Sequence, residues 1–271
     1  MQRSPLKTRP DGRVARADAE QTDARVIPVY VWELPVRLVH WTIFFSIVIL
    51  SVTGYYLHNP FIVVGSHGGR LLLVMRFIHE VTAFVFTMAF LVRVYWFFMG
   101  NRYAHWRAFV PLTRAQWVNG LQMLKYYLFL RWRAPSRVGH NSLAALAYLG
   151  IYLLMLVQIL TGLGLYSRVV GTGIWHALFS WIPNWINVQY LRETHYLIMF
   201  MFFGFTIHHV YSALLVSAEE KNGLMGSIFN GYKFVSVRLL RQEELIQENV
   251  VTEAPPVTVA PESTAATATE D

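Results

Sequence analysis

The sequence predicts an all-α integral membrane protein, a bundle of four transmembrane helices with both termini in the cytoplasm. Two observations lead to this prediction. First, 55% of the 271 residues are hydrophobic and only 14% are charged, whereas an ordinary soluble domain carries about 25% charged residues. Second, the apolar residues are concentrated in four runs, each long enough to cross the hydrocarbon core of a bilayer, which takes about 20 helical residues. A chain of this kind lacks the polar surface of a soluble protein.

The four predicted spans belong to one domain, residues 28–247, which ends in a cytoplasmic C-terminal segment. The arginine-rich residues 1–27 lack the apolar stretch of a signal peptide, so we expect a disordered basic cytoplasmic arm. Residues 248–271 are rich in Pro, Thr, Ala and Glu, and we expect them to form a disordered acidic tail. The spans themselves are residues 36–57, 71–99, 143–165 and 192–216.

The connections between the spans predict which side of the membrane each one occupies. Residues 100–139 carry seven basic side chains and no acidic one, whereas residues 59–70 and 166–191 carry one arginine each, Arg70 and Arg168. Basic connections stay in the cytoplasm, so residues 100–139 and both termini are predicted to face the cytoplasm from the cell (inner) membrane. This topology accounts for the net charge of +7, which therefore gives no reason to expect a nucleic-acid partner.

Two of the connections are more than turns. Residues 113–131 mix apolar and basic side chains, which predicts a helix lying on the anionic inner surface of the membrane lipid. The outer residues 173–187 contain Trp175, Trp181 and Trp185. Tryptophans at an interface are typical of the aromatic belt of a membrane protein; a docking surface for another protein is the alternative.

The chain contains no cysteine and ten histidines. The absence of cysteine excludes disulfides, thiolate metal sites, iron–sulfur clusters and covalently attached c-type haem. Ionisable side chains inside a membrane span are costly, and by default they mark a functional site. The histidines at span positions are His40, His79, His195, His208 and His209.

The direction and pitch of the helices place these histidines at two depths in the membrane, the cytoplasmic level and the outer level. Because successive spans run in opposite directions, His40 shares the cytoplasmic level with His208 and His209, and His79 shares the outer level with His195. His209 follows His195 by 14 residues, which brings it to within about 40° of the same helix face and about 21 Å along the axis. His208 lies about 140° from that face, so we expect it to point elsewhere.

Two facing histidines at each of two levels are the arrangement needed to hold two haems, each iron bound by an imidazole on both sides. The predicted pairs are His40 with His209 and His79 with His195. The alternative is that these side chains form polar contacts between helices and hold no cofactor.

Four arginines near the histidines are candidate partners for the haem propionates, because arginine pairs well with carboxylates at low dielectric. Three of them precede a proposed ligand by three residues, which places guanidinium and imidazole on one helix face; the fourth follows His79 by 14 residues. The alternative is that they extend to the membrane interface. These arginines are Arg37, Arg76, Arg192 and Arg93.

Small residues within the spans are also candidates for contact with a haem. Gly54 follows His40 by 14 residues, and a Thr161–Gly162 pair lies in the third span. Because glycine permits a close approach to the backbone, we expect these positions to clear room for a flat porphyrin. Packing of the helices through small residues is the alternative.

Several stretches of the sequence resemble, in the same order, the b-type cytochrome subunit of membrane-bound nickel–iron hydrogenases. The resemblance covers residues 28–236. The arginine–histidine–tryptophan cluster alone is shared with related di-haem cytochromes, including formate dehydrogenase subunits. The stretches are Y-V-W-E-L-P-V-R-L-V-H-W-T-I-F-F-S-I-V-I-L-S-V-T-G (30–54), R-F-I-H-E (76–80), L-V-R-V-Y-W-F-F-M-G-N (91–101), G-H-N-S-L-A (139–144), I-H-H-V-Y-S-A (207–213) and G-Y-K (231–233).

The resemblance implies a four-helix cytochrome with two haems b, in which His40, His79, His195 and His209 occupy the ligand positions. It implies the hydrogenase small and large subunits as partners on the outer face, and electron transfer from the small subunit through the haems to quinone near the cytoplasmic side. The hydrogen chemistry itself is expected on a partner subunit, because nickel–iron and iron–sulfur sites need cysteines that this chain lacks.

Two other functions are kept as alternatives. The same architecture could serve another quinone-linked oxidoreductase such as formate dehydrogenase, which would differ in its partner. A membrane transporter or proton channel that uses intramembrane histidines belongs to a different class and would be colourless, whereas a haem protein is red.

Overall fold

The computed structural model describes residues 26–61, 65–111, 114–132, 142–220 and 222–242. The predicted basic arm, apart from its last two residues, and the predicted acidic tail lie outside these described residues. The described residues fall into two compact units, one containing residues 26–29 and 235–242 and the other lying within Tyr30–Phe234.

Two short strands include the chain positions at which the units are divided. Strand β1 (Val26–Tyr30) and strand β2 (Tyr232–Ser236) form a two-stranded sheet. In the first unit, the end of β2 leads directly into helix α10 (Val237–Gln242).

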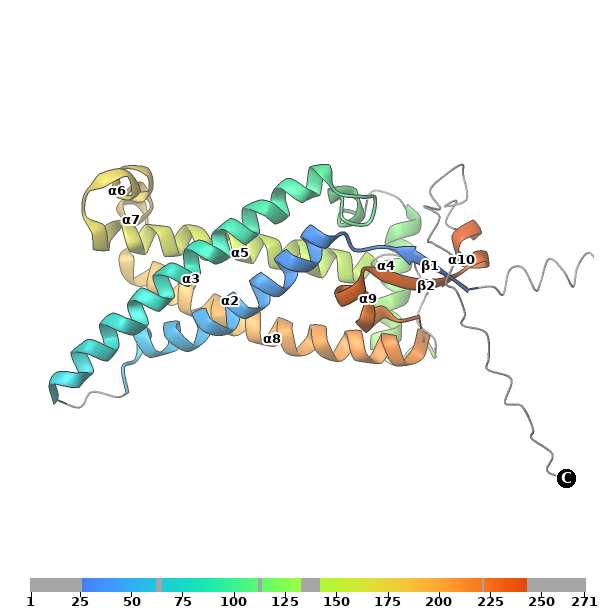
Figure 1. The fold of residues 1–271 in the computed structure, drawn as a ribbon, viewed down its shortest axis with the longest axis horizontal. Coiled ribbons are helices and arrows are strands. Elements are labelled where there is room, and N and C mark those ends of the chain that lie inside the picture. The colour runs from blue at the N-terminus through green and yellow to red at the C-terminus, as the bar shows by residue number, and fades with distance from the viewer. Residues whose placement is uncertain (1–25, 62–64, 112–113, 133–141, 221, 243–271) are drawn as a thin grey trace, which may run out of the picture. The chain divides into compact units, whose positions relative to one another are not determined.

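The second unit is built on four long helices, labelled α2, α3, α5 and α8 in Figure 1. Each is long and apolar enough to cross a membrane, so the prediction of an all-α membrane protein with four spans is confirmed. The helices extend beyond the predicted spans at most of their ends, because a helix continues into the polar interface after its apolar stretch has ended. Which side the termini occupy stays a prediction. The helices are α2 (Leu34–His58), α3 (Gly65–Met99), α5 (Ser142–Val170) and α8 (Val188–Glu220).

The start of α2 is tied to the end of α3. Pro35 lies in the first turn of α2, where a missing N–H costs nothing because that group has no partner within the helix. The Glu33 carboxylate accepts hydrogen bonds from the indole N–H of Trp96 and the backbone N–H of Asn101, both at 2.8 Å. These bonds set the position of α2, and with it His40, relative to α3.

Shorter helices connect the long ones. Helix α4 (Arg114–Tyr127) forms within the segment where a surface helix is predicted. Helices α6 (Gly173–Phe179) and α7 (Trp181–Trp185) form the tryptophan-containing connection between α5 and α8, where Trp185 is 86% exposed. The remaining short elements of the described chain are η1 (Trp106–Ala108) and α9 (Leu224–Asn230).

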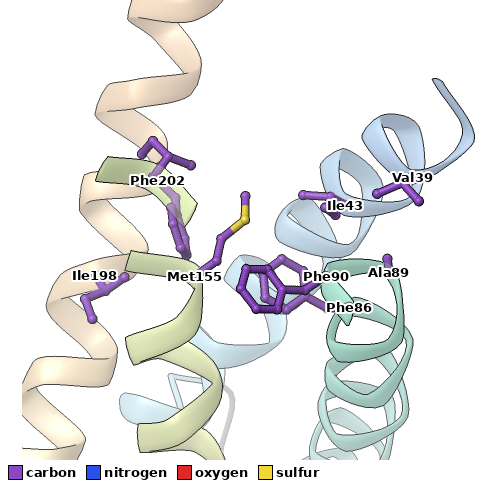
Figure 2. Packing of buried hydrophobic residues seen from close by; sticks show 9 residues of the cluster. Val39, Ile43, Phe86, Ala89, Phe90, Met155, Ile198 and Phe202 are labelled. Atoms are coloured by element: carbon purple, nitrogen blue, oxygen red, sulfur yellow. The ribbon is translucent and has the colours of Figure 1, made fainter. Parts of the chain in front are cut away.

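All four long helices contribute to the buried apolar core. In Figure 2, Phe86 and Phe90 of α3 reach toward Met155 of α5. On α8 the core residues Ile198 and Phe202 lie between His195 and His209, so the core separates the two histidine levels. Many other large apolar side chains of these helices are exposed, as expected for helices that are apolar all round and face lipid. The core residues are Val39, Ile43, Phe86, Ala89, Phe90, Ile151, Met155, Ile198 and Phe202.

Candidate cofactor site

The four predicted histidine ligands face one another in two pairs. Helix α2 packs closely against α3, and α5 against α8, while α2 and α3 approach α5 and α8 at few places. Between these two helix pairs, His79 of α3 lies opposite His195 of α8, and His40 of α2 lies opposite His209 of α8. In both pairs the centres of the imidazole rings are 6.3 Å apart.

This separation fits one iron atom between two imidazoles. A bond from a metal to an imidazole nitrogen is about 2 Å long, and the ring centre lies about 1 Å behind that nitrogen, so two rings on one iron are centred about 6 Å apart. Among the described residues, no group of three or more His, Asp or Glu side chains could hold a metal ion. The sites therefore offer two protein ligands each, which is the number that a porphyrin iron accepts in a b-type cytochrome.

The first pair and the residues that hold it form the His79 site, which consists of His79, His195, Thr53 and Thr161. The hydroxyl oxygen of Thr53 lies 2.9 Å from Nδ1 of His79, and the same hydroxyl donates its proton to the carbonyl of Ile49 at 2.8 Å. Because that proton is used on the helix carbonyl, the Thr53 oxygen accepts from Nδ1–H of His79. This bond assigns the tautomer in which Nε2 carries the lone pair that a metal needs.

His195 is held by the same arrangement on a different pair of helices. The hydroxyl oxygen of Thr161 lies 2.9 Å from Nδ1 of His195 and donates to the carbonyl of Val157 at 2.8 Å. Both histidines thus bond to a neighbouring helix through Nδ1 and keep Nε2 for a metal. The polar-contact and haem interpretations of these residues are therefore compatible with each other.

The second pair forms the His40 site, which consists of His40, His209, Tyr148 and Phe205. The Tyr148 hydroxyl lies 3.2 Å from Nδ1 of His209, and the Phe205 ring stacks on the same imidazole with centres 5.5 Å apart. Nδ1 of His40 is buried and has no hydrogen-bond partner among the described residues. Unlike the Nδ1 atoms of His79 and His195, this atom is not bonded to a threonine hydroxyl.

The adjacent histidines of α8 point in different directions. His209 faces His40, while His208 is exposed and lies edge-on to Tyr127 of α4, with ring centres 6.0 Å apart. Ser212 is within 3.4 Å of Nε2 of His208. Helix α8 is continuous through this region, so its regular pitch separates the two side chains.

Two of the four predicted arginines have buried nitrogens without a partner. Arg37 donates one N–H to the carbonyl of Phe229, and Arg76 forms an ion pair with Glu80 at 2.9 Å. Nε of Arg37 and Nη2 of Arg76 are buried and have no hydrogen-bond partner among the described residues. Each arginine lies one turn before a histidine, and a carboxylate such as a propionate would satisfy these nitrogens.

The other two arginines lie in different surroundings. Arg93 is only 4% exposed, donates to the Tyr152 hydroxyl at 3.0 Å and to the Ala104 carbonyl at 3.3 Å, and stacks on Phe97. Its polar contacts are thus made within the protein. Arg192 is exposed, one turn before His195. A propionate contact for either residue stays a prediction.

The glycines lie against the histidines themselves. A Cβ atom added at Gly54 would be 3.1 Å from Cε1 of His79, and one added at Gly162 would be 3.1 Å from Cε1 of His195. Sequence reasoning selected these glycines for porphyrin contact, and that role stays a prediction. It missed Thr53 and Tyr148 as partners of the histidines; the only signal was the Thr–Gly doublet, which occurs in two spans.

Comparison with known proteins identifies the family. Residues 31–231 match the family described as Prokaryotic cytochrome b561. The chain is 33% identical over 222 residues to the Probable Ni/Fe-hydrogenase 1 B-type cytochrome subunit of Escherichia coli K12, an alignment that covers 79% of this chain and 94% of the relative.

Two further relatives carry similar names. The Probable Ni/Fe-hydrogenase B-type cytochrome subunit of Bradyrhizobium diazoefficiens is 34% identical over 229 residues, which is 82% of this chain and 93% of the relative. That of Cupriavidus necator is 34% identical over 230 residues, which is 80% of this chain and 94% of the relative. With four apolar helices and a family match over most of its length, the chain is a multi-pass membrane protein that belongs to the prokaryotic cytochrome b561 family.

Proposed function

We propose that this chain is the B-type cytochrome subunit of a Ni/Fe hydrogenase, an electron-transfer subunit that holds two haems b and serves quinone as the electron acceptor. The observation that carries the proposal is the two facing histidine pairs, each with ring centres 6.3 Å apart and each completed by one histidine of α8. Bound haem b supplies a one-electron carrier, because its iron alternates between the ferric and ferrous states.

The chain's own residues would hold and separate the two cofactors. His79 and His195 are the proposed ligands at one level, and His40 and His209 at the other. The two α8 ligands are 14 residues apart, which corresponds to about 21 Å along a helix. The apolar core between the levels keeps water away from the space between the sites.

The proposed charge compensation comes from arginine. The buried, unpartnered nitrogens of Arg37 and Arg76 support a role in binding propionates at the His40 and His79 sites respectively. Isolated carboxylates in a low-dielectric region are costly, and a guanidinium beside them reduces that cost.

The proposed route runs from the outer face to the cytoplasmic side. The donor is the small subunit of the hydrogenase, bound with the large subunit at the outer face, and the acceptor is quinone near the His40 site. The names of the relatives favour a hydrogenase over formate dehydrogenase as the partner. The basic residues 100–139 support the orientation, because basic connections remain in the cytoplasm.

An absorption spectrum of the purified full-length chain, with a haem-to-protein ratio, tests the cofactor part of the proposal. We expect a red protein with two haems b per chain, both reducible by hydrogen when the hydrogenase subunits are bound. A colourless protein would favour the transporter or channel alternative, and co-purification of an enzyme without nickel would favour a different donor.

Reporter fusions test the orientation separately. A reporter fused after Arg107 or after Arg241 is expected to behave as cytoplasmic, and one fused near Trp181 as external. An external signal from the Arg107 fusion would reverse the proposed topology and the direction of electron transfer.

A further inference from the structure

The most regular feature of the interior is a threonine–glycine step that occurs twice. One step is Thr53–Gly54 on α2 and the other is Thr161–Gly162 on α5. Each contacts one histidine of the His79 site, and the two contacts have the same dimensions. The hydroxyl-to-Nδ1 distance is 2.9 Å in both, and a Cβ added at either glycine would lie 3.1 Å from Cε1 of the same ring.

Each residue of the step constrains the ring in a different way. The threonine is 3% exposed at position 53 and 7% exposed at position 161, so water does not compete with its hydroxyl for the imidazole. The glycine lets the edge of the ring come closer to the helix than a side chain would allow. A Cβ contact of 3.1 Å is tighter than nine in ten real Cβ contacts, so a larger residue would force the ring to move.

The threonine hydroxyl also determines what the imidazole can offer to a metal. Its proton is bonded to a carbonyl of its own helix, so its oxygen acts as the acceptor for Nδ1–H. A histidine that donates from Nδ1 is more basic at Nε2, and it is fixed in one ring orientation. More basic axial ligands stabilise ferric over ferrous iron, which lowers the reduction potential of a haem.

From this geometry we propose that Thr53–Gly54 and Thr161–Gly162 are positioning residues that orient His79 and His195 and lower the reduction potential of the haem that these histidines bind. The proposal rests on the proposed function, because it needs a haem at the His79 site. The His40 site lacks the same support: Nδ1 of His40 has no partner among the described residues. The effect is therefore expected at one of the two haems only.

A redox titration of the purified complex, followed by absorbance and by electron paramagnetic resonance of the ferric haems, tests the threonines. In Thr53→Val and Thr161→Val, the midpoint potential of one haem is expected to become more positive, with altered g-values, while the other haem keeps its wild-type values. Thr53→Ser and Thr161→Ser retain the hydroxyl and are expected to restore both properties. The matched control is Thr87→Val on α3, because Thr87 donates to the carbonyl of Ala83 in the same way without a described contact to a histidine.

The glycines are tested by adding a single methyl group. Gly54→Ala and Gly162→Ala press on the imidazole, so we expect changed g-values, or loss of haem, at the same single site. Gly150→Ala on α5 and Gly204→Ala on α8 are the controls, because a Cβ at either position meets no atom within 4 Å.

The possible results separate the proposal from the function on which it rests. A wild-type protein without haem at the His79 site would overturn both. Two haems in the wild type, with unchanged potentials and g-values in the valine variants, would overturn the role of the threonines alone. The haem at the His40 site reports folding within the same molecule. If a valine variant loses both haems, the serine and alanine variants decide. Wild-type g-values in Gly54→Ala and Gly162→Ala would count against the proposal. A serine variant whose midpoint potential or g-values differ from those of the wild type would also count against it.

Discussion

The His79 site and the His40 site present the same pair of side chains, but the protein holds them differently. At the His79 site each ring lies against a glycine and is bonded to a threonine of a neighbouring helix. At the His40 site large aromatic residues surround the rings: Tyr148 bonds to His209, Phe205 stacks on it, and Trp41 lies edge-on to His40. Close backbone approach and aromatic packing are thus two ways to fix an imidazole, and only the first gives both Nδ1 atoms a hydroxyl partner.

The two ends of the bundle also differ in their ionisable neighbours. Beyond His209, α4 brings Tyr126 into a hydrogen bond with Glu219 of α8, and Tyr127 lies beside His208. Near His79 the described ion pair is internal to α3, between Arg76 and Glu80. Quinone reduction takes up protons, and His208, Tyr127 and Glu219 are protonatable side chains at the end proposed as the quinone side.

The largest expected effect comes from removing a ligand. His79→Ala or His195→Ala should lose one haem and stop hydrogen from reducing the remaining one, because in the proposed route electrons enter through the His79 site. His40→Ala should keep a haem that hydrogen reduces, but should not reduce quinone. Spectra of the hydrogen-reduced complex show whether the remaining haem is reduced, and reduction by dithionite shows that this haem is bound. A hydrogen-to-quinone assay measures quinone reduction. Hydrogen-to-quinone electron transfer in a folded His79→Ala protein would remove that site from the route.

The adjacent histidines of α8 provide the sharpest test of the His40 site. His209→Ala should remove one haem, since His209 faces His40, whereas His208→Ala should keep both haems and change at most the rate or pH dependence of quinone reduction. A haem-to-protein ratio for each variant checks this. The opposite result would mean that α8 is not a regular helix between His195 and His209 in the membrane.

The arginines should affect the two sites separately. Arg37→Gln is expected to lower the midpoint potential of the haem at the His40 site, and Arg76→Gln that of the haem at the His79 site. Removing a positive charge beside a propionate leaves negative charge that favours the ferric state. A redox titration resolves the two haems; if both substitutions shifted the same haem, the assignment of one arginine to each site would be wrong.

Arg93 should behave differently from these two arginines. Its guanidinium is buried among Phe97, Phe109 and Tyr152 and bonds to the Ala104 carbonyl. Arg93→Gln is therefore expected to lower stability by about 1–3 kcal/mol, the cost of leaving buried polar groups unpaired, without a selective shift of either haem. Thermal unfolding in detergent together with a redox titration measures both effects. A selective shift of one haem at unchanged stability would instead favour a propionate contact.

The smallest expected effect concerns Tyr126. Its hydrogen bond to the Glu219 carboxylate raises the pKa of Tyr126 to about 12. A raised pKa means that the bond contributes stability below about pH 10, the usual tyrosine value, and that this contribution is lost as the pH rises through the raised value. Tyr126→Phe should remove one high-pH component from the ultraviolet titration of the tyrosines, and Glu219→Gln should move it to lower pH. The effect on stability at neutral pH should stay below about 1 kcal/mol, because the pair is largely exposed.

Much of the geometry of the candidate cofactor site followed from the helical pitch. The 14-residue interval between His195 and His209, together with the alternating direction of the spans, predicted which histidines face each other. Such a prediction is possible because one continuous helix carries a histidine of each pair, so position along the chain converts directly into depth and angle.

The sequence by itself determined the membrane class, the four spans and the histidine levels, because these depend on local composition and on regular helix geometry. Only the tertiary structure decided which side chains support the paired histidines. Thr53 meets His79, and Tyr148 meets His209, across helix interfaces that no spacing within one helix specifies. Arg93 matched the helical face of His79 yet lies in an aromatic enclosure with Tyr152. Its partner was set by how α3 packs on α5, since the reach of a long side chain depends on its neighbours.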